Sequence, residues 1–137
     1  MKTDLPQTIY LKDYQPPAFW VDTVHLRFDL DPAATEVVAT LALRRNTHGA
    51  AQALHLDGEK LDLIGLQIDG EDVSGEAYHQ TDEGLTIAQV PDAFTLTVTT
   101  KIAPAKNTEL EGLYQSNGMF CTQCEAEGFR KITYFPD

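Results

Sequence analysis

The residues of this chain that could do chemistry lie close together near its C-terminal end. Cys121 and Cys124 form a C-x-x-C pair, and Gln123, Glu125 and Glu127 recur at every second position around it. Two thiols at this spacing are half of a zinc site or a dithiol redox pair. A carboxylate beside an amide can bind an ammonium ion through charge-assisted hydrogen bonds. In an extended segment the three polar side chains would share one face, so this acidic row is either a cation site or a solvated edge of a β domain.

The thiol pair is interpreted as structural, because a closed zinc site needs two further ligands. The other candidate ligands are four histidines whose spacing matches no metal motif: His25, His48, His55 and His79. A redox pair is expected at a helix N-terminus after a strand, and this segment has no helical pattern. The chain also contains no H-E-x-x-H, G-x-S-x-G, Walker or dinucleotide-binding motif. We therefore expect no catalytic residue and no metal site within these residues.

Charge and composition exclude several classes of partner. The 137 residues include ten Lys and Arg and 21 Asp and Glu. The resulting net charge of −11 repels nucleic acid. We find no apolar run long enough for a secretion signal or a bilayer span. Two cysteines are too few for a disulfide framework, which fits a reducing compartment. These features predict a soluble cytoplasmic protein, without nucleic-acid or membrane partners, and a single domain over residues 1–137.

The elements that must position the acidic row are strands. Apolar and polar residues alternate over 24–30 and again over 36–45, and Asp31-Pro32 between them predicts a turn, so the pair is a predicted hairpin. Shorter strands are expected around 53–57, 61–69, 85–89 and 94–101, separated by DGE, DGED and TDEG turns. The pattern predicts an all-β antiparallel sandwich of about seven to nine strands with little or no helix.

The two ends of the chain carry separate expectations. Prolines punctuate residues 1–20, where no helix should start. Residues 130–135 are a predicted strand, and the chain stops directly after them without a closing element. We interpret that ending as a cut inside a larger protein.

The segment LEGLYQSNGMFCTQCEAEGFRKITYFPD resembles the block near the start of bacterial aminopeptidase N, a zinc-dependent alanyl aminopeptidase of the gluzincin class. YLKDYQPPAFWVDTVHLRFDLDP resembles the opening segment and first strand of the same family, so the similarity covers nearly all 137 residues. The resemblance implies most of a saddle-like N-terminal β domain. The catalytic domain, which would supply the zinc ligands and the catalytic motifs, is absent from this chain.

The resemblance also implies roles for individual residues. Glu125 matches the family's glutamate that binds the free amino group of the substrate, and Gln123 matches the glutamine that lines the pocket for the first side chain. Glu127, Phe129 and Arg130 are expected to support the loop, and Met119 and Phe120 to pack it. By this interpretation the full-length enzyme is a metalloprotease that binds zinc and removes N-terminal residues from peptides. The fragment binds no metal and is inactive alone, and its partners are peptide substrates and the missing catalytic domain.

Two other interpretations of the sequence stay open. The chain could be a stand-alone β-sandwich binding module whose acidic loop captures a cationic ligand or a partner protein. It could also be a C-x-x-C zinc or redox module, which would bind stoichiometric metal or show a titratable dithiol. If the chain is a fragment, the surface that normally meets the catalytic domain is an exposed apolar patch, and we expect some self-association.

Overall fold

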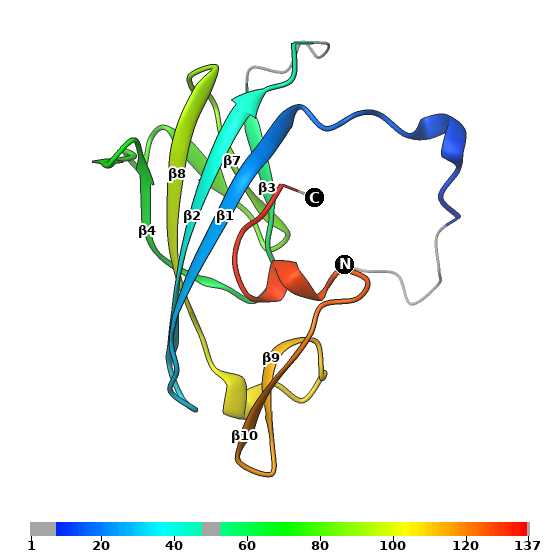
Figure 1. The fold of residues 1–137 in the computed structure, drawn as a ribbon, viewed down its shortest axis with the longest axis vertical. Coiled ribbons are helices and arrows are strands. Elements are labelled where there is room, and N and C mark those ends of the chain that lie inside the picture. Colours follow the sequence, from blue (N-terminus) through cyan, green and yellow to red (C-terminus); the bar gives the residue numbers. More distant parts are fainter. Residues whose placement is uncertain (1–7, 48–52, 137) are drawn as a thin grey trace.

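The computed structural model describes residues 8–47 and 53–136, which form three antiparallel sheets and three short 3₁₀ turns (Figure 1). The elements in chain order are η1 (Leu11–Asp13), β1 (Phe19–Asp29), β2 (Thr35–Arg45), β3 (Leu54–Asp57), β4 (Asp62–Ile68), β5 (Glu71–Asp72), β6 (Tyr78–Gln80), β7 (Gly84–Ile87), β8 (Ala93–Ile102), η2 (Pro104–Lys106), β9 (Gly112–Ser116), β10 (Met119–Gln123) and η3 (Gly128–Lys131). The predicted all-β antiparallel class is confirmed.

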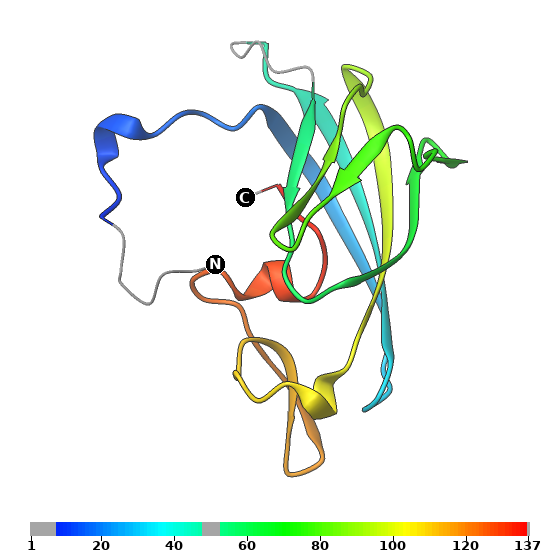
Figure 2. The ribbon, with the colours of Figure 1, turned by 180° about the vertical axis from the view of Figure 1, so that it is seen from behind.

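The main sheet has five strands in the order β1-β2-β8-β4-β5, and a smaller sheet has the order β3-β7-β6. Figure 2 shows the smaller sheet lying across one face of the main sheet. The core between them is made of apolar side chains from both sheets and from the segment after η3: Val37, Leu41, Leu43, Leu54, Leu56, Leu85, Ile87, Phe94, Leu96, Val98, Ile132 and Tyr134. The predicted alternation along β2 and β8 therefore identifies the inward-facing residues correctly.

The turn between β1 and β2 is built as its sequence predicts. The Asp31 carboxylate accepts hydrogen bonds from the backbone N–H of Ala33 at 2.8 Å and of Ala34 at 3.1 Å. The buried Thr35 hydroxyl donates to the Asp31 carbonyl at 2.7 Å. These side chains satisfy backbone groups that the tight turn leaves without ladder partners.

β1 differs from the half-buried strand that its alternation predicts. Val24 and Phe28 pair with Leu41 and Val37 of β2, so they point to the same face as the core. However, Val24 is 45% exposed and Phe28 36% exposed, because β1 is the edge strand and the smaller sheet does not extend over it. The inward face of β1 is therefore an uncovered apolar strip, which we define as Val24, Leu26 and Phe28.

The strand predicted over 130–135 is wrong. Gly128–Lys131 forms η3, and only Phe135 pairs in a β-bridge, with Asp57 of β3. Ile132, Thr133 and Tyr134 are all at most 2% exposed, and a surface strand cannot bury three consecutive side chains because successive ones point to opposite faces. The Tyr134 hydroxyl accepts a hydrogen bond from the Gln80 side chain at 2.9 Å, and burial raises the pKa of this phenol.

Two smaller expectations also need correction. The proline-rich lead-in contains one 3₁₀ turn, η1. Ten strands occur in the described ranges, more than expected, because β5 and β6 are only two and three residues long and β9 and β10 lie in a region without clear alternation. The signal for that last hairpin is Asn117-Gly118, where both residues have positive φ, 52° and 78°, as a tight hairpin turn requires.

Candidate functional site

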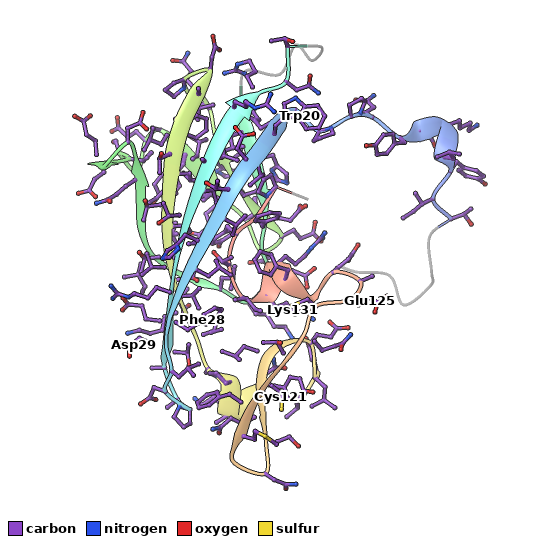
Figure 3. All side chains as sticks on the ribbon, viewed as in Figure 1. Trp20, Phe28, Asp29, Cys121, Glu125 and Lys131 are labelled. Atoms are coloured by element: carbon purple, nitrogen blue, oxygen red, sulfur yellow. The ribbon has the colours of Figure 1, made fainter. Side chains whose placement is uncertain are left out.

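The residues of the acidic row lie on a loop that joins the β9–β10 hairpin to η3. The hairpin is a two-stranded sheet of its own, in which Gln123 ends β10 opposite Gly112. The chain then turns through Cys124–Glu127 before η3 begins, so we define residues 123–128 as the site loop. Figure 3 shows Glu125 on the outer bend of this loop and Lys131 between η3 and the hairpin.

The ends of the site loop are held together by two glycines. The Gly128 N–H donates to the Cys124 carbonyl at 2.9 Å and closes the turn. A Cβ at position 128 would fall 2.2 Å from the Gln123 carbonyl oxygen and 3.1 Å from the Gly112 nitrogen. Gly112 itself has φ +76°, a conformation that side chains disfavour. Glycine is therefore required at both positions for the hairpin base and η3 to meet.

This turn overturns the expectation that three polar side chains share one face of an extended segment. Gln123 and Glu125 are both exposed, and the Gln123 side-chain amide donates to the Glu125 carbonyl at 3.3 Å, so these two residues are neighbours. The Glu125–Ala126 peptide bond is cis. Glu127 instead approaches Arg130, with Oε2 3.7 Å from Nη1. Gln123 and Glu125 are therefore exposed side by side on the loop, whereas Glu127 points back toward η3, where the loop ends.

Arg130 connects the site loop to the smaller sheet. Its side chain is 17% exposed, and Nη2 lies 3.7 Å from Oδ2 of Asp57 at the end of β3. The Arg130 carbonyl also accepts a hydrogen bond from the Glu59 N–H at 3.0 Å. These contacts join the site loop to β3, and the supporting role expected of Glu127 and Arg130 stays a prediction.

Met119 and Phe120, the first two residues of β10, are expected to pack the site loop. Phe120 is half-buried and packs against the core, so its expected packing of the loop stays a prediction. Met119 is 64% exposed and does not pack the loop, because it is the first residue after the exposed hairpin turn.

A charge cluster that no sequence pattern indicates fixes η3 to the chain before β9. The Lys131 ammonium donates to Glu109 Oε2 at 2.6 Å and to Glu111, and Lys60 donates to the other oxygen of Glu109. The hydrogen bonds from Lys131 and Lys60 lower the pKa of Glu109 to about 2. Burial opposes the charge on Lys131, but its carboxylate partners outweigh that effect and raise the lysine's pKa. The chain positions are too far apart for any sequence motif to reveal the cluster.

The candidate metal ligands do not assemble in the described part of the chain. Among residues 8–47 and 53–136, no group of three or more His, Cys, Asp or Glu could hold a metal ion. Cys121 and Cys124 are free thiols, the first half-buried and the second exposed. His79 lies in β6 rather than in a turn, and His48 lies outside the described residues. Within the same ranges no helix is long and apolar enough to cross a bilayer.

Two hollows flank the site loop. One of about 270 Å³ is lined by Val24, Ala126, Phe129, Arg130 and Phe135, and so joins the apolar strip of β1 to the loop. The other, of about 240 Å³, is lined by Glu59, Glu111, Ala126, Glu127 and Lys131. Ala126, which follows Glu125, therefore lines both hollows, the apolar one and the charged one.

Comparisons with known proteins give consistent matches. The chain is 52% identical over 137 residues to aminopeptidase N of Caulobacter vibrioides and 45% identical over 136 residues to aminopeptidase N of Escherichia coli. All of this chain is covered in the first match and 98% in the second, but it spans only 16% and 15% of those relatives' own lengths. The matched region is their N-terminal part. No family model matches the chain.

Solved structures of other proteins are also similar to this chain. Aminopeptidase A of Legionella pneumophila, in complex with aspartic acid, superposes with a TM-score of 0.84 at 32% identity and covers 93% of this chain and 15% of its own. Leukotriene A4 hydrolase of Saccharomyces cerevisiae has a TM-score of 0.69 at 21% identity over 96% of this chain and 24% of its own, which shows a shared fold.

Proposed function

Because the chain is similar over its whole length to the N-terminal part of bacterial aminopeptidase N, we propose that it is most of the N-terminal β domain of a zinc aminopeptidase. In this proposal residues 1–137 form one domain, and the protein that contains them removes N-terminal residues from peptides in the cytoplasm. The domain supplies the site loop, in which Glu125 binds the free amino group of the substrate and Gln123 lines the pocket for the first side chain.

The observation that carries the proposal is the placement of Glu125. Its side chain is exposed on the outer bend of a loop whose two ends are held by the Gly112 and Gly128 contact. A carboxylate held in this way accepts charge-assisted hydrogen bonds from an ammonium group without first ordering its own backbone. The Legionella relative is described in complex with aspartic acid, an amino acid that carries such an α-ammonium group.

The site loop contributes position rather than bond cleavage. An ammonium bound to Glu125 fixes the start of the peptide, so only the first peptide bond lies at a constant distance from this residue. Gln123 supports the same geometry because its amide holds the Glu125 carbonyl. In this proposal Glu125 selects for a free N-terminus, and Gln123 contacts the first side chain.

The described residues do not fit a zinc site, since no suitable group of ligands occurs among them. In the proposal, zinc and the catalytic groups belong to the remainder of the protein, and this chain alone is inactive.

The test compares hydrolysis of alanyl and leucyl amide substrates by the 137-residue chain and by the protein from the complete reading frame. We expect activity only in the complete protein. Loss of a hydrogen bond to a charged group costs about 1.5–3 kcal/mol, so Glu125→Ala should lower kcat/KM about 10- to 150-fold. Glu71→Ala is the matched control, because Glu71 is exposed on β5 at the far edge of the main sheet.

Two results would contradict the proposal. If the complete protein were active but indifferent to Glu125→Ala, the amine-binding role would be wrong. If the reading frame ended at residue 137 and this chain alone bound amine ligands through Glu125, the protein would be a stand-alone binding module.

A further inference from the structure

Lys131 is the side chain that ties the far end of the site loop to the hairpin at its near end. It is 13% exposed, and its ammonium donates to Glu109 and Glu111, which immediately precede β9. One side chain of η3 thus bridges to the chain that leads into the hairpin. The contact spans 20 positions to Glu111 and 22 to Glu109, so it fixes tertiary rather than local geometry.

The stem of Lys131 packs where the two ends of the loop meet. A Cβ on Gly112 would fall 3.0 Å from the Lys131 Cβ and 3.2 Å from the Gly128 carbonyl oxygen. Lys131 also lines the charged hollow together with Ala126, the residue after Glu125. The lysine therefore touches the hairpin base through its stem and faces the bend of the loop.

Lys131 forms ion pairs with two carboxylates other than Glu125, while Glu59 and Glu127 line the same hollow. The cluster contains two ammonium groups, Lys60 and Lys131, and two carboxylates, Glu109 and Glu111. Lys131 is thus already paired with two carboxylates, and its contribution to Glu125 is geometric. Only four residues separate Gln123 from Gly128, so a shift of η3 moves Glu125 directly.

We propose that Lys131 is a positioning residue for Glu125: its ties to Glu109 and Glu111 hold η3 against the hairpin and thereby set the place of the amine-binding carboxylate. This inference rests on the proposed function of the site loop. Selection for the free N-terminus stays with Glu125, and Lys131 positions that carboxylate without touching the substrate. Misplacement of a binding group by about 1 Å can lower the rate by about 100-fold.

The experiment uses the complete protein and kcat/KM for an alanyl amide substrate. Lys131→Met keeps the length of the stem and removes the ties, and it should lower kcat/KM by about 10- to 100-fold. Lys131→Arg keeps the charge and should restore most of the activity. Lys60→Met is the matched control, because it removes the other ammonium from Glu109 and leaves η3 tied. If the attachment of η3 positions Glu125, Lys60→Met should leave kcat/KM within about twofold of the value for the unsubstituted protein.

A double-substitution cycle separates positioning from general damage. If Lys131 acts through Glu125, Lys131→Met should have little further effect once Glu125→Ala is present. Should Lys131→Met fail to fold, Glu111→Gln removes the negative charge of one of the two partners and should give a smaller loss that also disappears in the Glu125→Ala background.

The outcomes distinguish this inference from the proposed function. No effect of Glu125→Ala means that the function proposed for the loop is wrong. A strong effect of Glu125→Ala, with Lys131→Met no worse than Lys60→Met, overturns the positioning role and leaves the function standing. Full additivity of Lys131→Met and Glu125→Ala overturns it as well.

Discussion

Replacement of Gly128 by alanine should damage the site loop directly. The new Cβ would lie 2.2 Å from the Gln123 carbonyl oxygen, which is backbone and cannot rotate away. An ordinary van der Waals contact of a Cβ atom is 3.4–4 Å, so η3 must move by more than about 1 Å relative to the end of β10. The Gly112 nitrogen, 3.1 Å from the same Cβ, blocks movement to that side.

The expected cost follows from overpacking. Forcing extra atoms into a packed site costs about 1–3 kcal/mol. We expect Gly128→Ala to lower the free energy of unfolding by that amount, with Tm falling by about 3–5 °C per kcal/mol for a chain of this size. Urea unfolding of the 137-residue chain followed by circular dichroism measures this change.

A matched glycine provides the control. A Cβ on Gly75 would meet nothing within 4 Å, and Gly75 has no positive φ. Gly75→Ala should therefore be neutral or stabilise the chain by up to about 1 kcal/mol, because alanine restricts the unfolded state. Equal stability of the Gly128→Ala and Gly75→Ala variants would refute the close contact and with it the argument that the two glycines hold the loop.

Two further predictions concern charge and the edge of the main sheet. Because the pKa of Glu109 falls from its ordinary value of 4.5 to about 2 on folding, this carboxylate stabilises the fold above pH 4.5, and that contribution disappears as the pH falls toward 2. Glu109→Gln should flatten the fall in the free energy of unfolding over this range, and an unchanged acid profile would contradict the pairing. The exposed strip on β1 should make the 137-residue chain self-associate at high concentration, and Val24→Thr with Phe28→Thr should weaken that association. Sedimentation equilibrium measures it, and a strictly monomeric unsubstituted chain would count against the prediction.

Much of the fold could be predicted because its main strands obey a period of two. β2 and β8 alternate cleanly, and Val37, Leu41, Leu96 and Val98 are buried as the pattern requires. In β1 the same pattern predicted correctly which side chains face the core, but it predicted that they are buried, and they are largely exposed. Alternation shows which side chains share a face of the strand, and it does not show whether another layer covers that face. Whether a strand is covered depends on how the two sheets pack on each other in three dimensions.

Less of the candidate site could be predicted from sequence patterns. The resemblance identified Gln123 and Glu125, and their roles stay predictions. Alternation failed for Glu127, because the Gly128 N–H closes a turn on the Cys124 carbonyl and the chain is no longer extended there. The partners of Lys131 lie about 20 positions away, beyond any periodicity.

The β9–β10 hairpin has a consequence for how long the site persists in its folded form. A two-stranded sheet is marginally stable by itself, so this hairpin depends on its attachments. These include the buried Leu113 and the Asn107 side-chain amide, which donates to the Glu111 and Leu113 carbonyls at 2.7 and 2.9 Å. Hydrogen exchange should therefore be faster for the hairpin amides than for those of β2, because the hairpin can open locally while the sandwich stays folded. The lifetime of the site is then set by these few attachments, and a high melting temperature of the sandwich does not guarantee an ordered site.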